Sequence, residues 1–275
     1  MINRVYLEVK LPALETTYLT DPTGGTGDYD QLVYTNSIGH ALIKECKIEI
    51  GGQQIDKHYG EWLEIWSELT LAAEKENGFN EMIGKQQADI GLKNTANIDQ
   101  LLFVPLMFWF NRNPGLSIPI IALQYHEVKI QIEFRPVMEC LVAIRADGDR
   151  ITAGTGGTPG NGFVLSSTGS ANIKFQYAQL YVDYVYLDTE ERRRFAQESH
   201  EYLIDQLQFT GADSLTMSEN KAGSYRMNFN HPTKEIVWVF QRDVNAPQNG
   251  GNVATNDWLS RASKNQWLSP LVSVF

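Results

Sequence analysis

Five histidines and two cysteines are the side chains in this sequence that are best suited to bind a metal. A metal site needs several such ligands close together, and the sequence spacing offers no cluster of them. No histidine has a second one within a few residues; they are His40, His58, His126, His200 and His231. We therefore predict no metal site and interpret each histidine as a surface residue or a hydrogen-bonded strand residue.

The two cysteines also lack the neighbours that catalysis needs. Cys46 and Cys140 both fall in segments with a strand pattern, where a free cysteine behaves as a small buried apolar residue. No CxxC pair is present for zinc, no GxSxG motif for a nucleophilic serine, and neither cysteine is next to a histidine. We predict no catalytic residue.

A row of carboxylates, Glu61, Glu64 and Glu68, lies in the segment with the clearest helical pattern. Apolar residues recur there at helical spacing: Trp62, Ile65, Trp66 and Leu69. The pattern predicts an amphipathic helix that packs through these four residues and turns its glutamates to solvent. Charge on a solvent face is expected without any function, so the row does not indicate acid–base chemistry.

A glycine-rich stretch within 146–170 does not have the features of a phosphate-binding loop. It contains Gly154-Thr-Gly-Gly-Thr-Pro-Gly160 but neither the lysine nor the helix that a phosphate cradle requires. We interpret 146–170 as a long exposed loop and predict no cofactor.

The composition of the chain limits the kinds of partner that it is expected to bind. Hydrophobic residues make up 43% of the 275 residues, charged residues 20% and aromatic residues 11%, and the formal net charge is −10. The only dense basic run, Arg192 to Arg194, follows Glu190 and Glu191 directly, so direct nucleic-acid binding is not expected. No apolar run is long enough to span a membrane and no signal peptide is visible, which predicts a soluble protein made in a cytosol-like compartment.

The elements that must position these residues are mostly strands. Alternating patterns predict strands at Val5–Val9, Leu42–Ile50, Val128–Phe134, Ile173–Leu187, Tyr202–Phe209, Ser224–Asn230 and Lys234–Gln241, and a buried or bent strand at Leu101–Phe110. Gly51 and Gly52 supply the positive φ angles of a hairpin turn. A short helix is expected over Asp188–Gln197. This order predicts an all-β antiparallel sandwich of the jelly-roll class.

Several stretches, in the same order along the chain, resemble the major capsid protein of the nucleocytoplasmic large DNA viruses, of the iridovirus and phycodnavirus type. They are Ile48–Asp56 with Tyr59–Leu69, Pro105–Leu116, Pro119–Ile130, Tyr184–Phe195, and Phe229–Gln241, which opens with Phe229, Asn230, His231 and Pro232.

The resemblance implies a tandem double jelly-roll. We expect a first roll at 1–187 with a helical insertion near 58–76, a linker at 188–198, and the opening part of a second roll at 199–275. Two complete rolls do not fit, so the second is expected to be incomplete in this chain. The helix around Trp62 would lie on the first roll.

The resemblance also implies a structural role rather than an enzymatic one. Three copies would form a pseudo-hexagonal trimer, and trimers would contact neighbouring trimers and minor capsid proteins in an icosahedral shell. The protein would be made in the host cytoplasm and end in the virion.

Three alternatives stay open. A minor or paralogous capsid component would share the fold. A sugar-binding β-sandwich surface protein could use exposed aromatic residues such as Trp258 and Trp267. A cupin-type enzyme would have to bind metal through residues on distant strands.

Overall fold

The computed structural model describes residues 1–20, 29–85, 99–145, 150–152, 163–211 and 226–239. Its strands are β1 (Ile2–Leu11), β2 (Leu19–Thr20), β3 (Tyr29–Tyr34), β4 (Ile43–Ile50), β5 (Gln53–Tyr59), β6 (Gln100–Pro105), β7 (Val128–Phe134), β8 (Leu141–Arg145), β9 (Arg150–Thr152), β10 (Val164–Leu165) and β11 (Tyr177–Tyr184). Its α-helices are α1 (Ile38–Leu42), α2 (Gly60–Thr70), α3 (Glu76–Ile83), α4 (Trp109–Arg112), α5 (Ser167–Asn172) and α6 (Thr189–Gln197), and its short 3-10 helices are η1 (Thr16–Tyr18), η2 (Ala73–Lys75), η4 (Pro114–Leu116) and η5 (Val137–Cys140).

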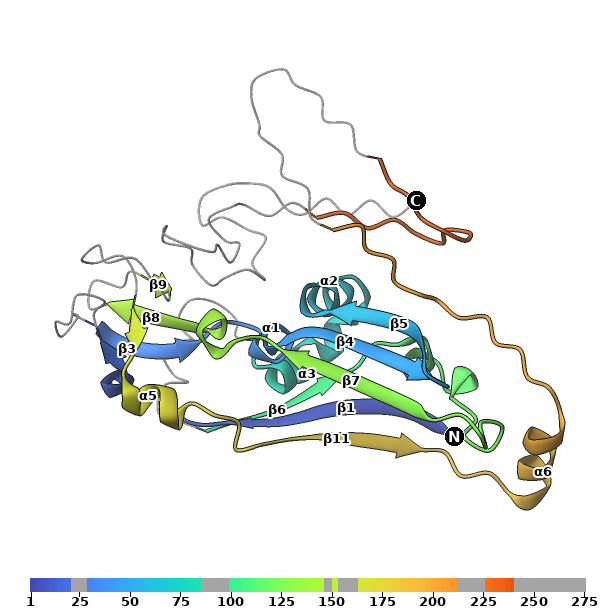
Figure 1. The fold of residues 1–275 in the computed structure, drawn as a ribbon. Coiled ribbons are helices and arrows are strands. Elements are labelled where there is room, and N and C mark those ends of the chain that lie inside the picture. Colours follow the sequence, from blue (N-terminus) through green and yellow to red (C-terminus); the bar gives the residue numbers. More distant parts are fainter. Residues whose placement is uncertain (21–28, 86–98, 146–149, 153–162, 212–225, 240–275) are drawn as a thin grey trace.

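The strands form two facing layers with a smaller group at one end. One layer has the order β11-β1-β6 and the other β5-β4-β7, and Figure 1 shows them stacked one above the other. The sheet β3-β8-β9 and the pair β10-β2 lie at the end of the sandwich that also carries α5. All of these pairings are antiparallel, which confirms the prediction of an all-β antiparallel sandwich.

The core lies between the two layers. Successive side chains in a strand point to opposite faces, so Leu7 and Val9 of β1 point inward and meet Ile48 of β4 and Val104 of β6 in one cluster. The largest side chains that are fully buried are aromatic: Phe108, Phe110 and Phe163. Most strands therefore share one large apolar cluster, while Val33, Val142 and Ile144 form a small second cluster on β3 and β8.

A two-residue turn joins β4 and β5. Ile50 pairs with Gln53 across it, and Gly51 and Gly52 between them have φ angles of 61° and 81°. Such turns need positive φ at both positions, which glycine adopts without strain.

The structure corrects three local predictions in the sandwich. The segment Leu101–Phe110 is a strand only to Pro105, because the Asn111 side chain accepts a hydrogen bond from the Phe108 N–H at 3.2 Å and starts α4. Cys140 ends η5 and only precedes a strand. The range 146–170 lies partly outside the described residues, and its described part contains β9, β10 and the start of α5 rather than a continuous loop.

The segment after β11 leaves the sandwich. Asp188 caps α6 by accepting a hydrogen bond from the Glu191 N–H at 2.9 Å, which confirms the predicted helix, and α6 has no buried residue. The chain then runs back past β5 and α2 (Figure 1). We call the described residues 199–211 and 226–239 the C-terminal arm.

The described residues of the C-terminal arm contain no strand, so the strands predicted there at Tyr202–Phe209, Ser224–Asn230 and Lys234–Gln241 are wrong where the structure describes them. Alternating residues give an extended backbone, but a strand also needs a neighbour whose backbone groups pair with its own. The arm is held mainly through side chains instead: the Gln208 amide bonds both the N–H and the carbonyl of Asn230, each at 2.9 Å.

Candidate interface between the sandwich and the C-terminal arm

Helix α2 packs on the sandwich through small and polar residues. The helix buries Gly60, Leu63, Glu64 and Ser67, which recur at helical spacing. A Cβ atom at Gly60 would collide with the backbone carbonyl oxygens of His40 and Ile43. Glycine at this position therefore lets α2 lie directly against α1 and the start of β4.

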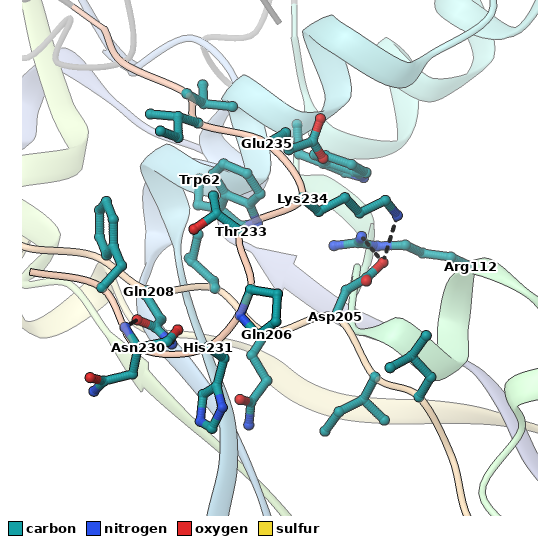
Figure 2. A pocket seen from close by; sticks show the side chains of 18 of the residues that line it. Trp62, Arg112, Asp205, Gln206, Gln208, Asn230, His231, Thr233, Lys234 and Glu235 are labelled. Atoms are coloured by element: carbon teal, nitrogen blue, oxygen red, sulfur yellow. Dashed lines mark hydrogen bonds and ion pairs between the residues drawn. The ribbon is translucent and has the colours of Figure 1, made fainter. Parts of the chain in front are cut away.

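The predicted packing face of α2 requires correction. Trp62, Ile65 and Trp66 are only half-buried and Leu69 is 37% exposed. The close approach at Gly60 turns the helix so that the two tryptophans face the C-terminal arm instead of the sandwich core. Their rings lie 5.5 Å apart and line a groove beside the arm. Figure 2 shows Trp62 in this groove.

Glu64, which was expected on the solvent side, is at the centre of a buried polar cluster. Its carboxylate lies 2.6 Å from His40 Nδ1 and 3.0 Å from Lys85 Nζ, and it accepts a hydrogen bond from the Ser37 hydroxyl at 3.2 Å. Burial alone would raise the pKa of Glu64, but the hydrogen bond and charge of His40 and the ammonium of Lys85 outweigh burial and lower the pKa to about 2. The cluster thus holds an ionised carboxylate beneath α2.

A second buried carboxylate lies on β5, beside the C-terminal arm. Asp56 is 3% exposed, and its Oδ2 lies 3.0 Å from His58 Nε2. Its Oδ1 accepts hydrogen bonds from the N–H groups of Lys57 at 2.8 Å and Leu207 at 3.1 Å. The last of these bonds joins residues 151 positions apart and connects the sandwich to the arm.

Two further contacts between β5 and the arm follow the same order along both segments. The Gln206 side chain donates to the Ile55 carbonyl, and the rings of Tyr59 and Phe209 lie 5.2 Å apart. Residue numbers therefore rise together on β5 and on the arm, which means that the arm lies parallel to β5.

Charged residues close the rim of this groove. The guanidinium of Arg112, from α4, stacks 4.2 Å above the ring of Trp66. Asp205 lies between Arg112 at 3.9 Å and Lys234 at 3.0 Å, as Figure 2 shows. The groove between these groups has a volume of about 710 Å³.

The four residues of the predicted family motif, Phe229, Asn230, His231 and Pro232, also line the groove. They lie in the arm without strand pairing, and His231 adopts a left-handed φ of 70°. The hairpin glycines lie on the sandwich, in the turn between β4 and β5.

A further exposed surface lies along β11. Within the described residues this strand pairs with β1 alone. Several large side chains on and just after it stay exposed: Tyr181 at 53%, Tyr184 at 51% and Tyr186 at 92%. Exposed apolar surface on a strand edge is typical of a contact with another protein surface.

Within the described part of the chain, the histidines and cysteines considered for chemistry do not form a metal-binding cluster. His40 and His58 are buried on separate elements, and the described residues contain no group of three His, Cys, Asp or Glu side chains able to hold a metal ion. Both cysteines are free and buried, and burial raises the pKa of each thiol to about 12. Among the described residues, no helix has the length and apolar character to span a bilayer. Trp258 and Trp267 lie outside the described residues.

From the sequence we did not predict that Asp56 and Arg112 contact the C-terminal arm, or that Glu64 is buried beneath α2. The small residues Gly60 and Ser67, spaced with Leu63 and Glu64 as i, i+3, i+4 and i+7, were the available signal for the close face of α2. No comparable signal marks Asp56 or Arg112, because their partners lie far away in sequence.

The two facing antiparallel sheets define a protein of the jelly-roll class. Residues 1–188 match the family model described as major capsid protein N-terminus, and residues 191–272 match the one described as large eukaryotic DNA virus major capsid protein. The chain belongs to this family, the major capsid proteins of large eukaryotic DNA viruses.

The relatives and solved structures that the chain matches are also viral capsid proteins. The chain is 41% identical over 248 residues to capsid protein 1 of Acanthamoeba polyphaga mimivirus, covering 87% of this chain and 38% of the relative. It is 40% identical to the major capsid protein of Phaeocystis pouchetii virus, covering 88% and 46%. A chain of the PBCV-1 virus capsid quasi-atomic model matches with a TM-score of 0.64 and 29% identity, covering 96% of this chain and 59% of that one. PBCV-1 VP54 matches with a TM-score of 0.61 and 31% identity, covering 88% and 49%.

These matches confirm the jelly-roll class and the resemblance to the viral capsid family. The chain spans about half the length, or less, of the curated relatives it matches: 38% of the mimivirus protein, 46% of the Phaeocystis pouchetii virus protein and 49% of the major capsid protein of Pyramimonas orientalis virus.

Proposed function

We propose that three copies of this protein form a capsomer with a pseudo-hexagonal outline, and that such capsomers tile an icosahedral virus shell. The observation that carries the proposal is the match of 96% of the chain to a chain of the PBCV-1 virus capsid. A shell repeats the same contacts many times, so one chain can supply every surface that it needs.

The division of the chain into units is part of this proposal. Residues 1–187 form the first roll with its helical insertion near 58–76, 188–198 form the linker, and 199–275 begin the second roll. The two family models meet between residues 188 and 191, and α6, which lies there, has no buried residue. Both observations support a boundary at this point.

Physical features of the surface support self-association. The exposed tyrosines of β11 can supply the buried aromatic contacts that dominate protein interfaces. Weaker contacts between capsomers suffice, because each capsomer is held by several neighbours at once. The net charge of −10 favours solubility before assembly and does not favour binding of a nucleic-acid backbone.

In this account the protein is made in the host cytoplasm, enters the virion shell and contacts minor capsid proteins there. It acts without a cofactor and catalyses no reaction.

Negative-stain electron microscopy of the purified protein tests the proposal. Averaged images of single particles should show threefold symmetry. Images that contain only separate monomers, at every concentration tried, would contradict it.

A paralogous capsid component is the second candidate, because capsid protein 1 and probable capsid protein 4 of one mimivirus both resemble this chain, at 41% and 32% identity. Quantitative mass spectrometry of purified virions separates the two. A major capsid protein should be the most abundant protein of the shell, and a paralogous component should be present in far fewer copies.

A further inference from the structure

We infer that the buried carboxylate of Asp56 is the positioning residue that fixes the C-terminal arm on β5, and so places the second unit of the protein against the first. The inference rests on the proposed division into two units. It assigns a role to a carboxylate that the proposed function does not itself use.

The edge of β5 explains why such a residue is needed. In the sheet β5-β4-β7, β5 pairs with β4 and with no second strand of the part of the chain that the structure describes. The arm lies along β5 but forms no ladder with it. A ladder would fix the register through many backbone bonds, whereas here the bonds are few and each involves a side chain.

The register depends on two adjacent contacts, which pair Ile55 with Gln206 and Asp56 with Leu207. Gln206 is exposed, and its long side chain can reach more than one carbonyl. Asp56, in contrast, is 3% exposed and confined by His58 and by the Lys57 N–H. Only one position of the arm brings the Leu207 N–H to its Oδ1, so this bond sets the register.

Burial makes the bond costly to lose. A buried carboxylate is costly when its oxygens lack hydrogen bonds, and among the described residues Oδ1 of Asp56 accepts both N–H bonds while Oδ2 accepts none. Loss of the bond from Leu207 would therefore leave this carboxylate poorly compensated. The rings of Trp62 and Trp66 and the pair that Arg112 makes with Asp205 lie around the same segment of the arm.

Hydrogen exchange of the arm amides in the full-length protein tests the inference. Leu207→Pro removes the N–H that Asp56 accepts while leaving the sandwich sequence intact. The matched control is Leu203→Pro, the same substitution four residues earlier at a side chain that is 91% exposed. Asp56→Ala removes the acceptor from the other side of the same bond.

We expect Leu207→Pro and Asp56→Ala to speed exchange of the other amides of residues 204–209 at least about tenfold, and Leu203→Pro to change it much less. Amides of β1 and β4 report on the sandwich and should be unaffected by Leu207→Pro. If Asp56→Ala does not fold, Leu207→Pro decides alone. Unchanged arm exchange in Leu207→Pro, or equal acceleration in both proline variants, would overturn the inference.

The mass of the wild-type protein separates this outcome from failure of the proposed function. Trimers whose arm exchange is insensitive to Leu207→Pro would refute only the role of Asp56. Monomers whose arm is released by Leu207→Pro would refute only the trimeric capsomer.

Discussion

Replacement of Glu64 by glutamine should destabilise the sandwich by about 3 kcal/mol at pH 7. In the folded protein the pKa of Glu64 is about 2, against 4.5 for an unperturbed glutamate. Each pKa unit corresponds to about 1.4 kcal/mol, so the ionised carboxylate beside His40 and Lys85 stabilises the fold by about 3 kcal/mol relative to a neutral side chain. Glutamine has nearly the same shape and is neutral, so Glu64→Gln loses this contribution without opening a cavity.

The difference between wild type and Glu64→Gln should depend on pH in a defined direction. Because the pKa is lowered on folding, the stabilisation is complete above pH 4.5 and is lost as the pH falls towards 2. The same two pKa values predict a difference of about 2 kcal/mol at pH 3.5. Urea unfolding followed by tryptophan fluorescence, at pH 7 and pH 3.5, measures both differences.

Glu68→Gln is the matched control. Glu68 also pairs with Lys85, but its side chain is 60% exposed, and exposed ion pairs contribute less than about 1 kcal/mol. A loss in Glu64→Gln no larger than in Glu68→Gln, or a loss that does not shrink between pH 7 and pH 3.5, would refute the reasoning from burial and pKa.

Three further predictions concern packing and reactivity. Gly60→Ala should destabilise the protein by roughly 2–3 kcal/mol in thermal or urea unfolding, because the new methyl group collides with backbone that cannot move aside. The control Gly78→Ala, in α3 with open space around it, should be neutral or stabilising by up to about 1 kcal/mol. Equal effects of the two substitutions would contradict the steric explanation at Gly60. Cys46 and Cys140 should not react with a thiol reagent at pH 8 until urea unfolds the protein, because both are buried with a pKa of about 12; rapid labelling of the native protein would contradict this. Arg112→Ala should weaken docking of the arm by about 1 kcal/mol through loss of the stack on Trp66, seen as faster exchange of the arm amides, and unchanged exchange would argue against a role for the stack.

The sandwich could be predicted from sequence because strand periodicity is a local signal. Leu7 and Val9 of β1 and Ile48 of β4 alternate with polar neighbours, and the structure places all three in one core. The hairpin at Gly51 and Gly52 also depends on residues adjacent in the chain.

The orientation of α2 could not be predicted from hydrophobic spacing. The tryptophans suggested one face, whereas the helix packs through Gly60 and Ser67, because small residues allow the closest approach of backbone to backbone. Glu64 was interpreted as exposed for the same reason. Its burial depends on His40 and Lys85, which come from other parts of the chain.

The C-terminal arm shows a second limit on what the sequence alone can predict. Its alternating residues predicted strands, but pairing depends on neighbours that a local pattern does not specify. The structure instead joins Leu207 to Asp56 across 151 residues, a contact that neither segment reveals alone.

Light scattering over a range of concentrations gives the mass of the purified protein in solution and tests whether three copies associate. We predict a stable species of three times the chain mass of 31.1 kDa. A single species of 31.1 kDa that persists at high concentration would contradict it.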